Sequence, residues 1–215
     1  MAYSKLDFHF RHPNTIMVSG PTQSGKTWFV KKILEQRLIH PFPTRIVWVY
    51  KDWQPLYDEL QAFYPHIEFI HGYNDKIYEE FDPLINNLLV IDDQMENASN
   101  ANSLSTLFTV GSHHRNLTVI YLVQNQYTKG KSTRSVGLNT NYNVIFRNNG
   151  DLTQTEMVFR RRVKRNSKWL SEAFDDATSV PHGYIILDNR QGTPPELRVR
   201  TGILDGETAV IYQEA

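Results

Sequence analysis

Eight residues near the amino terminus constrain the fold more strongly than any other part of this sequence. Residues 20–27 read Gly-Pro-Thr-Gln-Ser-Gly-Lys-Thr, which fits the phosphate-binding pattern G-x-x-x-x-G-K-[S/T] at every fixed position. An apolar stretch, Thr15–Ser19, precedes the motif, and the apolar residues of the segment that follows it have helical spacing. This order of strand, loop and helix predicts a phosphate-binding loop at 20–27 rather than a simple glycine-rich turn.

The residue types of the motif suit a nucleoside triphosphate. The backbone N–H groups of the loop must turn inward around phosphate oxygens, and a side chain at Gly25 would obstruct them. We expect Lys26 to reach the β- and γ-phosphates and Thr27 to offer its hydroxyl to Mg²⁺. ATP is the expected nucleotide, because the Asn-Lys-x-Asp element of GTPases is absent. The predicted nucleotide-binding residues are Gly20, Pro21, Thr22, Gln23, Ser24, Gly25, Lys26 and Thr27.

Short apolar strands alternate with helical segments along the chain. Some strands are apolar throughout, such as Leu88–Ile91, as expected of parallel strands that are covered on both faces. The alternation predicts an α/β domain of three layers with a mainly parallel central sheet. The predicted strands are Thr15–Ser19, Arg45–Tyr50, Ile67–His71, Leu88–Asp92, Leu117–Val123, Asn143–Arg147 and Tyr184–Asp188, and the predicted helices are Lys26–His40, Pro55–Phe63 and Ser103–Val110.

Length and composition fit one globular domain. The chain has 215 residues, of which 40% are hydrophobic and 21% are charged, and no linker separates a second domain. We predict a single domain over 1–215, with a core at about 13–190 and a C-terminal extension at 191–215. The sequence has no cysteine, which excludes disulfides, thiolate zinc sites and cysteine nucleophiles. No apolar run approaches the roughly 20 residues of a membrane span, and the first residues are too polar for a signal peptide, so we expect a soluble intracellular protein.

Two carboxylates follow the apolar stretch Leu88–Ile91. An aspartate at the end of such a strand holds Mg²⁺, usually through a coordinated water, and the next acidic residue can accept a proton from the attacking water. We therefore predict Asp92, together with Thr27, as the metal site and Asp93 as the general base. A solvated Asp-Asp turn is the structural alternative.

An amide follows another apolar strand, Leu117–Val123. If this strand lies between the phosphate-loop strand and the acidic strand, Gln124 would lie beside the γ-phosphate, where it could bind the attacking water and a phosphate oxygen. Arg115 precedes the strand at its opposite end, so it would reach the nucleotide of a neighbouring subunit as an arginine finger. A surface salt bridge is the alternative for Arg115, and Arg134 is a rival finger.

The motifs at 20–27, 88–93 and 124, with Arg115 between the last two, together resemble the FtsK–HerA superfamily of DNA-pumping ATPases. They resemble most the short viral genome-packaging ATPases of the poxvirus, Polinton and adomavirus type, and the stretch 107–126 is especially similar to that branch. The resemblance covers about residues 13–190. It implies a RecA-like (ASCE) core in which the strand that bears Gln124 lies between the other two. Many members have glutamate after the metal aspartate, whereas this chain has Asp93, and Glu96 is a weak substitute.

The resemblance also implies the roles of individual residues, the assembly and the partners. Lys26 and Thr27 match the nucleotide clamp, Asp92 the metal–water ligand, Gln124 the sensor and Arg115 the finger. The implied assembly is a homo-oligomeric ring, a hexamer or a pentamer, that moves double-stranded DNA through its centre. A capsid vertex protein would be its partner, in an infected host cell (nucleus or cytoplasmic virus factory) or in the virion.

Two basic segments are candidates for DNA contact. The run 160–168 holds six of the 23 Lys and Arg residues and could grip a phosphate backbone without reading sequence. Alternatively, the run could be a nuclear import signal, form a solvated helix face or contact another subunit. The loop 129–134 closely follows Gln124 and suits a pore loop. The candidate DNA contacts are Lys129, Lys131, Arg134, Arg160, Arg161, Arg162, Lys164 and Arg165.

The sequence therefore predicts a Mg²⁺-dependent ATPase that translocates DNA and packages a viral double-stranded DNA genome into a capsid. Two other functions stay open. A nucleoside kinase of the thymidine-kinase type also joins a phosphate loop to an acidic strand end, although those enzymes usually carry a cysteine-ligated zinc lobe. A non-catalytic assembly factor that binds ATP as a structural switch is the other alternative.

Overall fold

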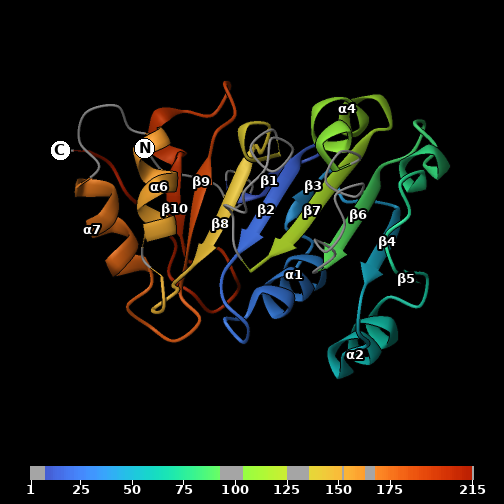
Figure 1. Cartoon of the computed structure of the whole chain (residues 1–215), viewed down its shortest axis with the longest axis horizontal. Helices are drawn as coiled ribbons and strands as arrows, with labels where there is room; N and C mark the ends of the chain where they lie inside the picture. Colours follow the sequence, from blue (N-terminus) through green and yellow to red (C-terminus); the bar gives the residue numbers. More distant parts are fainter. Residues whose placement is uncertain (1–7, 93–103, 125–135, 152, 163–167, 215) are drawn as a thin grey trace.

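A nine-stranded sheet forms the centre of the computed structural model, which describes residues 8–92, 104–124, 136–151, 153–162 and 168–214 (Figure 1). The strand order is β11-β10-β9-β8-β2-β7-β6-β4-β5. The six strands from β8 to β5 are parallel, whereas β9, β10 and β11 are antiparallel to their neighbours. The strands are β2 Thr15–Ser19, β4 Arg45–Tyr50, β5 Glu68–His71, β6 Asn87–Asp92, β7 Leu117–Val123, β8 Tyr142–Phe146, β9 Tyr184–Asp188, β10 Val199–Thr201 and β11 Val210–Ile211.

The predicted α/β fold with a largely parallel sheet is confirmed. All seven predicted strands occur, and their ends differ from the predicted ones by no more than one residue. The continuously apolar strands are those buried on both faces: every residue of β2, β6 and β7 is buried.

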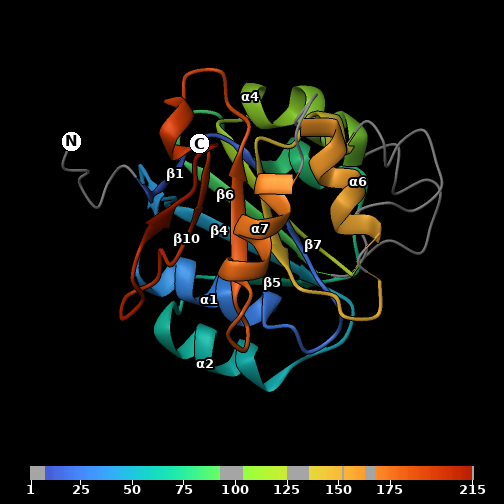
Figure 2. The same ribbon diagram turned by 90° about the vertical axis from the view of Figure 1, so that its left-hand side faces the viewer.

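Helices cover both faces of the sheet. Ile16 and Val18 of β2 belong to the core cluster that includes α1 (Lys26–Glu35) and α2 (Pro55–Phe63). Met17, which lies between them in sequence, packs on the opposite face with Leu107 and Phe108 of the helical segment 104–114. Figure 2 shows α1 and α2 on one side of the sheet and α4 (Ser112–His114) on the other.

The first helix is shorter than predicted. We expected it to run over 26–40, but α1 ends at Glu35, and Arg37 has a left-handed backbone with φ of 54°. Leu38 is buried in the same core as α1 although it lies beyond the helix, which explains why its spacing looked helical. Ile39–His40 (β3) then pairs in parallel with Phe10–Arg11 (β1) in a separate two-stranded sheet.

The predicted helix Ser103–Val110 is part of a longer helical segment. It continues through a π-helical stretch, Leu107–Gly111 (η3), into α4, and Ser103 lies outside the described residues. Several elements were not predicted, and most of them are short or polar. They are η2 Ile77–Glu80, α6 Thr153–Arg162, α7 Lys168–Ala177, η4 Pro195–Leu197, β1, β3, β10 and β11. No helix in the described part of the chain is long and apolar enough to cross a membrane.

A buried ion pair joins β10 to β9. The Arg200 guanidinium is fully buried and lies 3.3 Å from the Asp188 carboxylate, which also accepts from Arg190 at 2.7 Å and from the hydroxyl of Thr193 at 2.9 Å. Burial, and then the charge of Asp188, raise the pKa of Tyr142 to about 12, so this neighbouring phenol stays neutral. Neither the Arg200 nor the Asp188 side chain has access to water, so each charge depends on the other for compensation.

Replacing Asp188 by alanine should therefore destabilise the protein strongly. The change leaves the buried charge of Arg200 without its carboxylate, for which we expect a loss of about 3 kcal/mol in the free energy of unfolding. Urea denaturation measures this loss. Asp75→Ala is the matched control, since Asp75 is exposed and forms no ion pair within the described residues, and it should change stability by less than about 0.5 kcal/mol. Equal stability of the two variants would contradict the assignment.

Candidate functional site

The loop 20–25 links β2 to α1 and has a backbone that needs glycine. Gly25 has φ of 103°, and a Cβ built there would lie 3.2 Å from Nδ1 of His182. A Cβ on Gly20 would lie 2.7 Å from Phe146 Cβ and from Ser24 Oγ. Both glycines let the loop pass close to its neighbours, and Gln23 adds a second left-handed position with φ of 65°. The loop thereby keeps the curved path that a phosphate cradle requires.

The amino terminus of α1 is suited to an anion. The residue that precedes the helix is Gly25, no side chain caps the helix there, and its first turn contains no acidic residue. The amide N–H groups of this turn point along the axis without helical acceptors, and the helix dipole adds a partial positive charge. Lys26 Nζ lies across the loop, where it donates to Gly20 O at 2.7 Å and to Pro21 O at 2.8 Å. The loop and helix therefore concentrate positive charge at one point.

Asp92, at the end of β6, lies beside the first turn of α1. Its Oδ2 accepts a hydrogen bond from Thr27 Oγ1 at 3.3 Å and another from the Tyr57 hydroxyl at 2.8 Å. Asp92 is buried, and Tyr57, on α2, is fully buried. Burial, followed by the negative charge of Asp92, raises the pKa of Tyr57, so the phenol remains a donor to the carboxylate.

Tyr57 was not singled out from the sequence as a site residue. It packs in the core cluster under α2, but its hydroxyl also fixes the predicted metal ligand. Nothing in the local sequence marks this second role, because α2 comes from a different part of the chain than Asp92. The pairing depends on how α2 packs against the sheet.

The strand order brings Gln124 to the same place. β7 pairs with β2 on one side and with β6 on the other, so the strand that Gln124 follows lies between the phosphate-loop strand and the acidic strand. Ser19 is level with Val123, and Asp92 is level with Leu122. The three strand ends open into one cavity of about 410 Å³, whose lining includes Thr22, Gln23, Gly25, Lys26, Thr27, Asp92 and Gln124.

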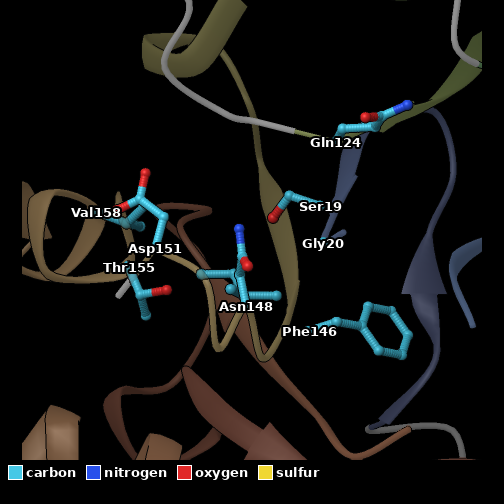
Figure 3. Close-up of a pocket in the computed structure, with 9 residues that line it drawn as sticks. Ser19, Gly20, Gln124, Phe146, Asn148, Asp151, Thr155 and Val158 are labelled. Carbon is cyan, nitrogen blue, oxygen red and sulfur yellow. The ribbon is translucent and has the colours of Figure 1, made fainter. Parts of the chain in front are cut away.

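A second, smaller hollow lies beside the loop on the β8 side. Figure 3 shows Gln124 across from Asn148 and Asp151, which come from the segment between β8 and α6. The hollow measures about 20 Å³, room for roughly one water molecule. Asp151 Oδ1 also accepts a hydrogen bond from Thr153 N, at the start of α6, at 3.1 Å. Sequence reasoning did not single out Asn148 or Asp151, although their place just beyond a predicted strand could have signalled them.

Arg115 lies at the opposite end of the sheet from this cavity. It precedes β7, whose first residue is level with Asn87 at the start of β6. Its half-buried guanidinium donates to Phe81 O at 3.4 Å, and within the described residues it forms no ion pair. The structure therefore places Arg115 away from the cavity of its own chain, and its role as an arginine finger stays a prediction.

Several predicted site residues lie outside the described residues. The proposed base Asp93, the substitute Glu96 and the loop residues Lys129, Lys131 and Arg134 are among them, as are Lys164 and Arg165 of the basic run. Arg160, Arg161 and Arg162 form the end of α6, but the positions of their side chains are not described. Their roles stay predictions.

Comparison with known proteins supports the fold. No protein-family model matches the sequence, and no curated protein is detectably similar to it. Among solved structures, the genome packaging NTPase B204 of Sulfolobus turreted icosahedral virus 2, in complex with AMPPCP, is similar with a TM-score of 0.53 and 13% identity, over 94% of this chain and 98% of that one. B204 of Sulfolobus turreted icosahedral virus, described as a DNA-packaging ATPase, has a TM-score of 0.52 and 11% identity over 95% and 98%.

A bacterial protein shares the fold as well. ATPase domains 2 and 3 of EssC from Geobacillus thermodenitrificans are similar with a TM-score of 0.58 and 11% identity, over 91% of this chain and 41% of that one. The resemblance to viral genome-packaging ATPases that the motifs predicted is thus confirmed at the level of the fold.

Replacing Gly25 by alanine should disable the loop. A non-glycine residue in the left-handed region costs about 1–2 kcal/mol, and the new Cβ would press on His182. We expect roughly tenfold weaker binding of ATP, measured by calorimetry. Gly192→Ala is the control, because a Cβ there meets nothing within 4 Å and the backbone is not left-handed. Unchanged binding by both variants would show that the loop does not need its conformation.

Proposed function

We propose that this protein is an ATP-hydrolysing motor that moves double-stranded DNA and packages a viral genome into a capsid. The observation that carries the proposal is one cavity lined by Lys26, Asp92 and Gln124. These residues lie at or beyond the carboxyl ends of three adjacent parallel strands, β2, β6 and β7. The similar fold of B204, a viral genome packaging NTPase in complex with AMPPCP, supports the same class of activity. The core is then RecA-like, with the Gln124 strand in the middle of the site.

The residues of the cavity, together with Asp93, would each serve one part of phosphoryl transfer. The ammonium of Lys26 and the amides at the start of α1 bind the β- and γ-phosphates. The amide of Gln124 orients the attacking water, because it offers both a donor and an acceptor at the end of β7. Asp93, directly after β6, takes the proton of that water as general base.

The residues around Asp92 fit a magnesium ion. A threonine hydroxyl and a carboxylate are hard oxygen donors, the kind that Mg²⁺ prefers, and Thr27 Oγ1 lies 3.3 Å from Asp92 Oδ2. When bound, the ion would offset negative charge on the phosphoryl oxygens. Tyr57 keeps the carboxylate in one orientation through its hydrogen bond to Oδ2.

The assembly part of the proposal rests on Arg115. Since this residue lies at the end of β7 away from its own cavity, it would act on the nucleotide of the next subunit in a ring of five or six copies. The basic segments 129–134 and 160–165 would hold the DNA backbone. A capsid vertex protein would anchor the ring, in an infected host cell or in the virion.

An ATPase assay with and without long duplex DNA, combined with light scattering for mass, tests the proposal. Turnover should rise with DNA, and Lys26→Ala should lower it by roughly 100-fold or more, because the principal phosphate-binding cation is lost. Lys76→Ala is the matched control, since Lys76 is exposed and remote from the cavity. Phosphorylation of thymidine would favour a nucleoside kinase instead, and ATP binding without turnover even with DNA would favour an assembly factor.

The role of Tyr57 can be tested by removing its hydroxyl alone. Tyr57→Phe keeps the buried ring but frees Asp92 from one hydrogen bond, so we expect about tenfold lower turnover or a higher Mg²⁺ requirement. A magnesium titration of the ATPase rate measures both. Tyr64→Phe is the control: it also loses one hydrogen bond, of 2.7 Å to Leu34 O, but does not contact Asp92. Identical magnesium dependence of both variants would remove Tyr57 from the site.

A further inference from the structure

A third cavity, also of about 410 Å³, opens beside the phosphate loop, and its lining is more apolar than that of the cavity with Lys26 and Asp92. Its walls come from the start of α1, from the end of β8 and from the turn 180–183 that leads into β9. Most of its lining is aromatic or apolar, and Glu207 is its only acidic residue among those described. The apolar lining consists of Trp28, Phe29, Phe146, Val180, Pro181 and Tyr184.

We infer that this cavity, called the apolar hollow from here on, holds the nucleobase of the nucleotide whose phosphates bind the loop. The inference rests on the proposed function, because it assumes a nucleotide at 20–27. It adds the part of the site that recognises the base, which the sequence motifs do not locate.

The two cavities adjoin at the start of α1, where they share part of their lining. Gly25 and Trp28 line both of them. In the sheet, Asp92 ends β6 and Gln124 follows β7 on one side of β2, whereas the apolar hollow lies on the other side, toward β8 and β9. A nucleotide whose γ-phosphate lies near Gln124 therefore extends its nucleoside past Gly25 into the apolar hollow.

The wall opposite α1 is fixed to the phosphate loop. Nδ1 of His182 lies 3.1 Å from Ser24 O, within hydrogen-bond distance. Gly183 packs so closely that a Cβ there would lie 2.5 Å from Ala177 O. The turn also closes on itself, since Gly183 N donates to Val180 O at 3.0 Å. Because this wall is tied to the loop that holds the phosphates, base and phosphates would bind in a fixed relation.

Two large apolar side chains on this surface are exposed to solvent. Trp28 is 46% exposed and Val180 is 62% exposed. The Lys32 ammonium, which pairs with Glu35, lies 5.6 Å from the centroid of the Trp28 ring. A flat, weakly polar base would cover this apolar surface, and aromatic side chains are the usual stacking partners of bases.

A carboxylate at the rim gives the hollow a preference among bases. Glu207 Oε2 accepts from the Tyr184 hydroxyl at 2.6 Å and from Leu204 N at 3.1 Å, which leaves Oε1 as an acceptor. Burial, followed by the hydrogen bond to Glu207, raises the pKa of Tyr184, so the phenol keeps donating to the carboxylate. An acceptor at this position favours a base with an exocyclic amine, such as adenine, over hypoxanthine, which has a carbonyl in its place.

Calorimetric titrations of the full chain with ATP and with inorganic tripolyphosphate test the inference. Trp28→Ala should weaken ATP binding about tenfold or more and tripolyphosphate binding much less, because only ATP carries a base, although Trp28 also lines the phosphate cavity. Trp28→Phe should retain most of the ATP affinity, since it keeps a flat ring. Phe63→Ala, which removes an exposed aromatic residue distant from both cavities, should change neither affinity.

The outcomes separate this inference from the proposed function. Equal loss of both ligands in Trp28→Ala, or no loss of either, would overturn the base site. Wild-type protein that binds tripolyphosphate as tightly as ATP would also overturn it. If the protein passes these tests but shows no DNA-stimulated turnover, the base site is supported and the proposed motor function is contradicted.

The preference for an amine is tested with inosine triphosphate. Wild-type protein should bind ATP about fivefold more tightly than inosine triphosphate, the value of one added hydrogen bond. Glu207→Gln should reduce this ratio toward one, because the neutral amide can serve either base. Equal affinity of the wild type for the two nucleotides would overturn the assignment of Glu207.

Discussion

The parallel pairing of β7 with both β2 and β6 is the constraint on which the site depends. Loops that follow parallel strands leave the sheet at the same edge, so three segments far apart in sequence meet there. The register keeps their ends level, with Ser19 opposite Val123 and Asp92 opposite Leu122. A shift of one residue in either pairing would turn the buried side chains to the wrong face and misplace the loop relative to the carboxylate.

Much of this arrangement could be predicted from the sequence, because its signals are local. The motif at 20–27 has a fixed spacing, and buried parallel strands read as unbroken apolar runs. Prediction was wrong at the end of α1, where Leu38 reaches the same core from outside the helix. The sequence did not reveal that Tyr57 bonds to Asp92, nor that the apolar hollow exists. Both depend on how elements distant in sequence pack together.

The site has two chemical halves on either side of β2. Toward β6 and β7 lie the carboxylate and the amide, and toward β8 and β9 lies an apolar surface. The antiparallel strands β9 and β10 support the apolar half, since Tyr184 at the start of β9 and the buried pair of Asp188 with Arg200 join this part of the sheet. Residues near the carboxyl terminus thus contribute to a site whose motif lies near the amino terminus.

The two outermost strands of the sheet affect how copies of the chain can meet. β11 has two residues and β5 has four. Glu68 of β5 forms an ion pair at 2.8 Å with Arg45 of the neighbouring strand β4. Short strands with charged neighbours are poor templates for adding a further strand from another molecule. Continuous β-structure from one copy to the next is therefore disfavoured, and side-by-side association would have to use the helical layers and the connecting loops.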